Sequence, residues 1–407
     1  MMKVNRAAAP RFTEWEKMMR LKTLALASAA LFALTAGADA QQAPVKLGIL
    51  TTLTTPGGYI GEDVRDAMLL AIEEEGGKLG GVPVQALVED DKLKPGDGKQ
   101  IIEKWMETDK VKLFTGVIFS NVAIATVPTI LEGGGIFVSP NAGPSNFAGK
   151  ACHKNYYVAS WQNDNLHESA GALAKKLGYK KMVLLAPNYP AGKDALTGFK
   201  RMYGGEVVEE IFTGLDQTDF SAEMARIRAA KPDAVFQFHP GGQGIGFVKQ
   251  WAQSGLKDQI AMVVAAPSME QRIAAATGDA AIGIAATAHW NTDFKNPESQ
   301  AFVKAFMAKY NRLPTVYASQ GYDTAKLIGA ALKATGGKLD QDAFRAAMLK
   351  ADVKLTRGPF KFNNNQHPIQ DWYEVKAVKG ADGKVALETG AKVLEGHKDA
   401  YAQDCKL

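Results

Sequence analysis

The 407-residue chain has only two cysteines, Cys152 and Cys405, and its six histidines show no spacing typical of metal ligands. The phosphate-loop pattern Gly-x-x-x-x-Gly-Lys-Ser/Thr is absent, and so is the Gly-x-Ser-x-Gly pattern of many hydrolases. The glycine-rich stretch 241–246 misses the Gly-x-Gly-x-x-Gly frame of dinucleotide sites. We therefore predict a protein that is not an enzyme and that binds no metal and no cofactor.

A surplus of charge of one sign is also lacking. Residues 1–40 hold six of the 48 Lys and Arg residues and three of the 43 Asp and Glu residues, which leaves 42 cations against 40 anions in the remainder. Nothing in this balance favours a nucleic-acid partner or a membrane surface. No apolar run after residue 40 reaches the length of a transmembrane helix.

The first 40 residues have the pattern of a signal peptide. Arg20 and Lys22 precede the uncharged apolar stretch 23–38, and Ala38-Asp39-Ala40 matches the small-residue pattern of a cleavage site. We expect cleavage after about Ala40 and export of the rest of the chain as a soluble protein.

Export bears on the two cysteines. In an oxidising compartment two thiols usually pair, so we predict a disulfide between Cys152 and Cys405 that ties the C-terminal tail to the middle of the chain. Two free thiols are the alternative that the sequence leaves open.

From residue 45 to residue 139, short apolar runs alternate with stretches of helical periodicity. Strands separated by helices and short turns predict crossover connections and a mostly parallel sheet covered on both faces, the α/β class. The expected strands are 45–50, 82–88, 111–114 with Gly116, and 136–139, and the expected helices are 62–75, 99–108 and 122–131.

The same alternation returns after residue 160 and predicts a second α/β lobe. The aromatic stretch 156–163 is expected to connect the lobes without joining either sheet, and 280–290 and 366–375 are candidates for two further crossings. The lobes are then 41–159 plus 291–366 and 160–290 plus 367–407. The expected strands are 181–186, 207–212, 234–238 and 260–265, and the expected helices are 166–177, 195–203, 222–230, 244–253, 299–310 and 316–334.

The stretch 116–128, GVIFSNVAIATVP, predicts an anion site. A buried strand ends at Phe119, and Ser120 and Asn121 precede a run that can form a helix. The free N–H groups and the positive dipole end of that helix favour a bound anion. The alternative is that Ser120 only caps its own helix.

Several blocks carry a resemblance to a known family. Together, KLGILTTLTTPGGYIGEDVRDAMLLAIEEEGG, TGVIFSNVAIATVP, IFVSPNAGPS and GGQGIGFVKQWAQSGL resemble the periplasmic substrate-binding proteins of ABC importers, in the branched-chain amino-acid-binding family. The resemblance runs from about Val45 to about Val385. It implies a type I fold of two doubly wound lobes joined by three crossings. It also implies a monomeric periplasmic carrier that closes on a small ligand and delivers it to a membrane permease.

The resemblance implies ligand contacts as well. A serine matching Ser120 and the loop matching Asn141, Ala142 and Gly143 hold the ligand carboxylate in the family. Amino-acid binders have threonine at the place of Gly143 and an acidic residue on a loop matching 263–268. Here that loop has no carboxylate before Glu270. Because an unpaired buried ammonium is costly, we expect a ligand other than an amino acid.

The other candidate contacts are mostly aromatic and favour an aromatic carboxylate. The stretch RGPFKFNNNQHPIQDWYEV is similar to a branch of the family associated with aromatic acids such as coumarate. Trp290 is expected to fill the hinge instead. The remaining candidate contacts are Tyr59, Phe119, Trp161, Tyr189, His239 and Gln243.

Three alternatives stay open at this point. First, the ligand could be a branched-chain amino acid or an amide. Second, the protein could present its ligand to a sensor. Third, it could be a periplasmic enzyme that acts on small acids. For the leading hypothesis we expect lobe closure driven by a ligand that contacts both lobes at once.

Overall fold

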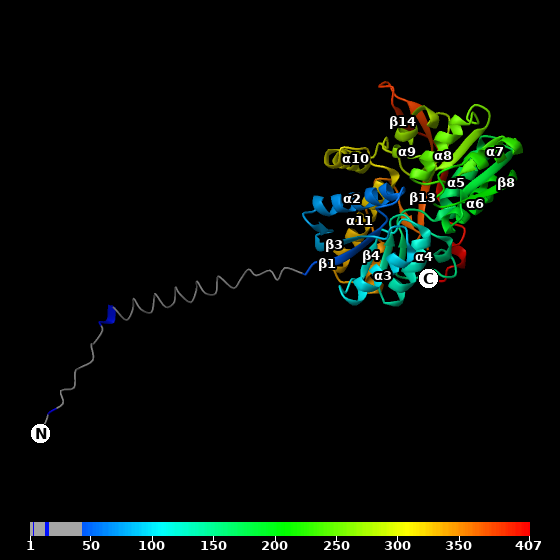
Figure 1. Ribbon diagram of the computed structural model, residues 1–407. Helices are drawn as coiled ribbons and strands as arrows, with labels where there is room; N and C mark the ends of the chain where they lie inside the picture. The colour runs from blue at the N-terminus through cyan, green and yellow to red at the C-terminus, as the bar shows by residue number, and fades with distance from the viewer. Residues whose placement is uncertain (1–2, 4–12, 16–42) are drawn as a thin grey trace. The chain divides into compact units, whose positions relative to one another are not determined.

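Strands and helices alternate along the chain and build two sheets, which form the centres of two lobes (Figure 1). The computed structural model describes residues 3, 13–15 and 43–407, and Pro44–Leu407 form one compact unit. The predicted signal peptide and its cleavage site lie almost entirely outside the described residues. Within those residues, none of the helices has both the length and the apolar character needed to cross a bilayer.

The first lobe is built on a six-stranded sheet with the order β2-β3-β1-β4-β5-β6. All neighbours are parallel except β2 and β3. Figure 1 shows α2 and α11 on one side of β1, β3 and β4, with α3 on the other. The strands are β1 (Val45–Thr51), β2 (Lys78–Leu79), β3 (Val82–Asp90), β4 (Leu113–Thr115), β5 (Ile136–Ser139) and β6 (Tyr156–Val158). The helices are α2 (Gly58–Glu74), α3 (Pro95–Glu107), α4 (Ser120–Glu132), α10 (Pro297–Tyr310), α11 (Val316–Thr335) and α12 (Gln341–Leu349).

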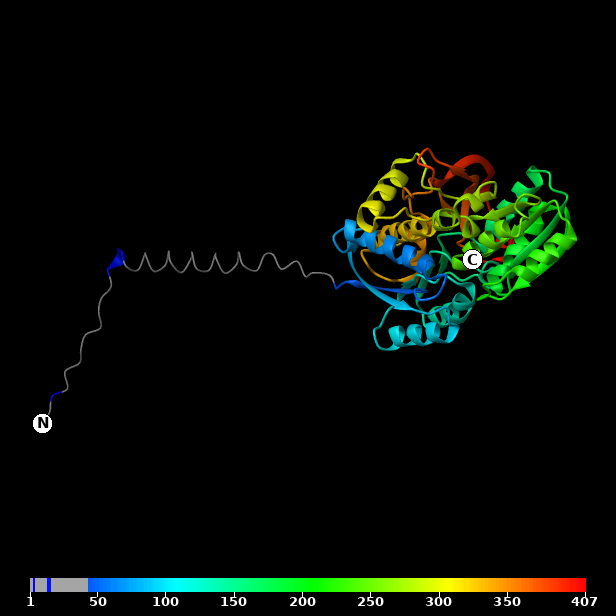
Figure 2. The same ribbon diagram turned by 45° about the horizontal axis from the view of Figure 1, so that its top comes forward.

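The second lobe is built on an eight-stranded sheet with the order β12-β13-β11-β10-β9-β7-β8, and β14 pairs with β13. Figure 2 shows its green and red segments grouped beside the blue and cyan first lobe. The strands are β7 (Lys181–Pro187), β8 (Glu206–Thr213), β9 (Ala234–Gln237), β10 (Ala261–Ala265), β11 (Ala285–Ala288), β12 (Lys361–Phe362), β13 (Pro368–Lys379) and β14 (Val385–His397). The helices are α5 (Asn163–Lys176), α6 (Pro190–Tyr203), α7 (Ser221–Ala230), α8 (Gly242–Gln253) and α9 (Gln271–Thr277).

The α/β class with two lobes is confirmed, and the predicted strands and helices lie close to their observed positions. Several helices begin earlier than expected. Pro95, Pro190 and Pro297 each occupy the first helical position, where a proline needs no N–H partner and its fixed φ suits a helix. The prediction did not include α9, α12, β2, β12 or β14.

The chain passes between the lobes at residues 159–162, 289–296 and 350–360. The expectation for 156–163 is wrong in part, because Tyr156–Val158 pair with β5 as the last strand of the first sheet. The stretches 280–290 and 366–375 contribute β11 and β13 to the second sheet, so the crossings lie beside them. The lobe boundaries at 159/160, 290/291 and 366/367 stay predictions. The first two fall within these crossings, and 366/367 falls between β12 and β13 of the second sheet.

A buried arginine ties two of the crossings together. The Arg357 guanidinium donates to the carbonyl of Ala159 at 2.7 Å, to the carbonyl of Ser160 at 3.1 Å and to Asp323 at 2.8 Å. Gln370 at the start of β13 accepts from Arg357 and donates to the same Ser160 carbonyl. The crossing segments therefore share one hydrogen-bonded network, which defines the hinge more tightly than three separate loops would.

The predicted disulfide is present. Cys152 and Cys405 are bonded, with their Cα atoms 5.7 Å apart and a sequence separation of 253 positions. Cys152 lies between β5 and β6 of the first sheet, and Cys405 follows β14 of the second. The bond is therefore a covalent link between the lobes in addition to the three crossings.

Replacing both cysteines by serine should lower the free energy of unfolding by about 2 to 5 kcal/mol, because a long closed loop restricts the unfolded chain. Reversible urea unfolding of the mature chain would measure this difference. Reducing the wild type should give the same loss, and the double variant should not respond to reductant. Equal stability of the oxidised wild type and the double variant would contradict the expectation.

Candidate functional site

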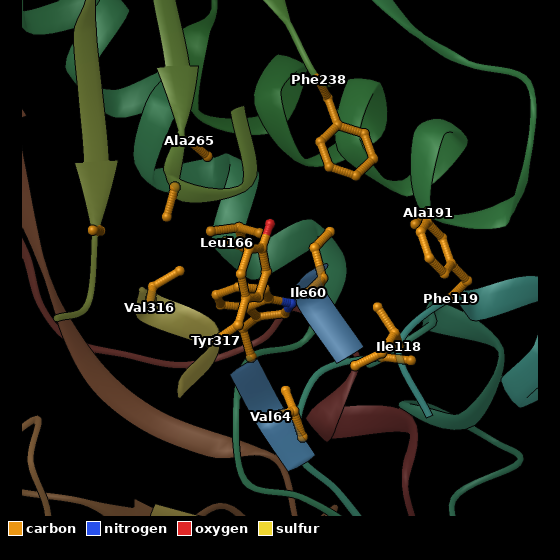
Figure 3. Close-up of a cluster of buried hydrophobic side chains, with 14 of the residues drawn as sticks. Ile60, Val64, Ile118, Phe119, Leu166, Ala191, Phe238, Ala265, Val316 and Tyr317 are labelled. Atoms are coloured by element: carbon orange, nitrogen blue, oxygen red, sulfur yellow. The ribbon is translucent and has the colours of Figure 1, made fainter. Parts of the chain in front are cut away.

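A small cavity lies between the lobes. Side chains of both lobes face it: Ile60 and Tyr317 from the first lobe lie opposite Leu166, Ala191 and Phe238 from the second (Figure 3). The lining consists of Ile60, Ile118, Phe119, Ser120, Asn141, Ala142, Trp161, Asn163, Leu166, His167, Tyr189, Ala191, Phe238, Pro240, Pro267 and Tyr317.

No Asp, Glu, Lys or Arg side chain belongs to this lining. Its one titratable imidazole, His167, is neutral at pH 7, because burial lowers the pKa of that ring to about 3. A charged group of a ligand in this cavity must therefore be stabilised by uncharged hydrogen-bond donors or acceptors.

The start of α4 presents such donors. Phe119 is the N-cap residue, has an extended backbone and makes no capping hydrogen bond through its side chain. The N–H groups of Val122 and Ala123 donate to the Phe119 carbonyl. Among the described residues, no partner exists for the N–H groups of Ser120 and Asn121. Ser120 is the first helical residue and does not cap the helix, so the alternative reading of Ser120 as a cap is wrong.

The hydroxyl of Ser120 has a defined orientation. Asn163 Nδ2 donates to Ser120 Oγ at 3.1 Å and to Asp194 Oδ2 at 3.0 Å, while Asn163 Oδ1 accepts from the Gly143 N–H at 3.3 Å. Because Ser120 Oγ accepts from Asn163, its own hydrogen is left to be donated elsewhere. Together with the free N–H groups of α4, it can bind a carboxylate.

Aromatic rings surround the rest of the cavity. Tyr189 and Phe238 are stacked with ring centroids 6.3 Å apart, and Phe119 lies 6.4 Å from Tyr189. Trp161 meets Tyr317 edge to face at 6.3 Å. Such rings offer flat apolar walls to a flat ligand.

Six of the ten predicted contacts line the cavity, and the other four do not. Their roles toward a ligand stay predictions. The six are Phe119, Ser120, Asn141, Ala142, Trp161 and Tyr189, and the four are Tyr59, Gly143, His239 and Gln243.

Gly143 and Tyr59 contact the wall of the cavity from outside. A Cβ atom on Gly143 would lie 2.1 Å from the Trp161 carbonyl oxygen, so only glycine fits this approach, and the Gly143 N–H bonds to Asn163. Tyr59 is the second residue of α2, and its hydroxyl donates to Glu270 at 2.8 Å.

His239 and Gln243 are engaged within the second lobe. His239 bonds through its ring to Gln237 and Thr213, and burial lowers its pKa to about 3. Gln243 donates to the Gly214 carbonyl at 2.7 Å in a neighbouring groove. Trp290 is buried beside the hinge, and its ring N–H donates to Ser299 Oγ. Its burial outside the cavity lining agrees with the expectation that it fills space at the hinge.

Several lining residues are not among the predicted contacts. Asn163 had a local signal, because an amide directly after a predicted crossing and before a helix is typical of a helix start. Tyr317 and Phe238 had none, since each lies in an apolar run that any buried helix or strand shows. Among the described residues, no group of three or more His, Cys, Asp or Glu side chains could hold a metal ion.

Known proteins share this architecture. A solute-binding protein of an ABC transporter from R. palustris, solved in complex with benzoate, is 31% identical, with a TM-score of 0.84, and the match covers 90% of this chain and 100% of that one. Another from Rhodopseudomonas palustris BisB5, solved with 3,4-dihydroxybenzoic acid, is 30% identical, with a TM-score of 0.82, and covers 88% of this chain and 99% of that one.

Sequence relatives agree on the family. The Leu/Ile/Val-binding protein homolog 6 of Brucella melitensis is 29% identical over 373 residues, which are 89% of this chain and 95% of that protein. The sequence pattern of the periplasmic binding protein family matches residues 44–384. The chain therefore belongs to the periplasmic binding proteins and is a solute-binding protein of the ABC-transporter type, a class of transport components and not of enzymes.

Proposed function

We propose that this protein captures a small aromatic carboxylate, such as a benzoate or a hydroxycinnamate, in the periplasm and delivers it to an ABC permease of the inner membrane. The observation that carries the proposal is the convergence of the Ser120 hydroxyl and the free N–H groups of α4 on a cavity walled by aromatic rings and free of charged side chains. Donors at one end suit a carboxylate, and the rings suit its aromatic body.

The absence of an acidic side chain from the lining counts against an amino-acid ligand. Glu270, the carboxylate nearest to the loop 263–268 in sequence, lies outside the lining and accepts hydrogen bonds from Tyr59 and from the N–H groups of Arg272 and Ile273. An α-ammonium in the cavity would have no carboxylate partner, which costs several kcal/mol in a desolvated site.

The relatives support both candidate ligand classes to different extents. The two R. palustris structures contain benzoate and 3,4-dihydroxybenzoic acid, whereas the Brucella relative is named for Leu, Ile and Val. The uncharged lining favours the first class. We infer closure around the ligand as the mechanism, because the cavity wall is assembled from both lobes and a ligand that contacts both favours the closed form.

A panel of ligands should separate the two classes. Benzoate, 4-hydroxybenzoate, 4-hydroxycinnamate, leucine and an aliphatic amide would be tested by calorimetry and thermal unfolding of the mature chain. We expect at least one aromatic acid to bind, with about 2.7 kcal/mol of stabilisation at a free concentration of 100 times Kd. We expect no shift with leucine or the amide. Stabilisation by leucine equal to or above that of every aromatic acid would overturn the proposal.

Ser120→Ala should weaken binding of the aromatic acid by about 10- to 100-fold, since a hydrogen bond to a charged group contributes roughly 1.5 to 3 kcal/mol. The midpoint of thermal unfolding without ligand should also fall somewhat, because the buried Asn163 amide loses Ser120 Oγ as an acceptor. Calorimetry would give both affinities. Ser221→Ala is the matched control, since Ser221 is the first residue of α7, outside the cavity lining. Unchanged affinity of Ser120→Ala would contradict carboxylate binding at the start of α4.

A further inference from the structure

Polar contacts join the two lobes directly beside the ligand cavity. Tyr59 on α2 of the first lobe donates its hydroxyl hydrogen to Glu270 Oε1 in the second lobe at 2.8 Å. Arg272 on α9 lies with its guanidinium carbon 4.7 Å from the centre of the Tyr59 ring and donates to Asp63 at 2.8 Å. These pairs lie behind the cavity wall, next to the lining residues Ile60 and Pro267.

We propose that Tyr59 and Glu270 form a latch that holds the lobes closed, and that they act on ligand binding as positioning residues without touching the ligand. The inference rests on the proposed function in one respect: the closed form of the protein must enclose a ligand. The hydrogen bond joins side chains 211 positions apart and from different lobes, so opening the cleft must break it.

The partners on each side are built for this contact. Glu270 is the N-cap of α9 and accepts from the N–H groups of Arg272 at 2.8 Å and Ile273 at 3.0 Å, which fixes the direction of its carboxyl group within the second lobe. Asp63, which accepts a hydrogen bond from Arg272, also accepts hydrogen bonds from Arg312 and Thr315 of its own lobe. Each side of the contact is therefore held rigidly before the lobes meet, so closing orders few additional groups.

Burial makes the hydroxyl of Tyr59 necessary to Glu270. Glu270 is 2% exposed. A buried carboxyl group that loses a hydrogen-bond donor retains the full cost of its desolvation. In an open cleft, water would replace the phenol at no such cost. The contact therefore affects the dissociation of the ligand from the closed form more than its first encounter with the open form.

Close backbone packing marks the same junction. The Gly242 N–H donates to the Pro56 carbonyl across the cleft at 3.2 Å. A Cβ atom on Gly241 would lie 3.0 Å from the Gly57 Cα atom, and the φ of Gly241 is +67°, so glycine is required there on both counts. The lobes thus approach each other closely on the side of α2 that bears Tyr59.

Tyr59→Phe should raise the dissociation rate of benzoate about 10-fold, by loss of one hydrogen bond to a carboxylate, and should change the association rate less than twofold. Stopped-flow tryptophan fluorescence would measure both rates. In a cycle with Glu270→Ala, which leaves the Tyr59 hydroxyl without its acceptor, the double variant should dissociate no faster than the faster single variant, because both changes remove the same bond. Tyr310→Phe is the matched control: its hydroxyl donates to the Asp66 carbonyl within the first lobe at 2.8 Å.

Two results would overturn the latch while leaving the proposed function intact: benzoate dissociating from Tyr59→Phe at the wild-type rate, or fully additive effects in the cycle. Should no acid of the panel bind, the proposed function fails, and the ligand-free protein still tests the latch. Single-molecule energy transfer between dyes on α3 and α7 would then report a lower closed fraction in Tyr59→Phe. Equal closed fractions would overturn the latch.

The pH dependence of ligand affinity provides a second test. A purely structural role of Glu270 would not change it. Burial in the closed form raises the pKa of Glu270 from its ordinary 4.5 to about 7, against the opposing hydrogen bonds from Arg272, Tyr59 and Ile273. Its charged or titratable neighbours are Tyr59 and Asp63 of α2, Arg272 of α9 and Tyr317 of α11. Glu270 also lines a small second cavity. The residues that β11, β13 and β14 contribute to that cavity, Ala288, Val375 and Leu387, are uncharged.

Since the closed form binds this proton more tightly than the open form, closure is favoured at low pH and loses that contribution as the pH rises through 7. The Kd of benzoate should therefore rise about 10-fold between pH 6 and pH 8, and Glu270→Gln should remove this dependence. Calorimetry at both pH values would measure it. The same slope in wild type and Glu270→Gln would contradict the burial of a titrating Glu270 on closure.

Discussion

The side-chain amide of Asn163 connects the parts of the candidate site. Its oxygen accepts from the Gly143 N–H, and its nitrogen donates to Ser120 Oγ and to Asp194. Through these bonds it joins the 141–143 loop, the start of α4 and the second-lobe helix α6 at the first residue after a crossing. Because the amide uses its donors in this way, the Ser120 hydroxyl is left with a hydrogen for a ligand. The chemistry of the cavity thus depends on one uncharged group at the hinge.

The same logic extends to the charges around the cavity. The carboxylates near it are already paired: Asp194 with Ser145 and Asn163, Glu270 with Tyr59, and Asp63 with two arginines. Their pairing removes them from the lining and makes several of them contacts between the lobes. Under the proposed function, a closed form with an uncharged interior and polar contacts at its edge would select a ligand by shape and by one charged end.

Much of this architecture followed from local patterns. Strand and helix positions from 45 to 265 depend on apolar spacing and on capping residues, which act over a few neighbours, so their prediction was accurate. Errors arose where the local signal was ambiguous. Three helices that begin with proline were predicted to begin several residues too late, and Tyr156–Val158 was predicted as a connection because aromatic strands and aromatic connections look alike. The long β14 was missed, since its polar, half-exposed residues give little alternation.

The sequence by itself determined the α/β class, and it predicted a signal peptide and an anion site at the start of α4, because each depends on residues adjacent in the chain. Only the tertiary structure decided which side chains meet in the cavity. Asn163 reaches Ser120 across 43 positions, and Tyr59 reaches Glu270 across 211. Such contacts depend on how two lobes close around a hinge, and no local pattern of hydrophobicity or capping encodes the distance between residues so far apart.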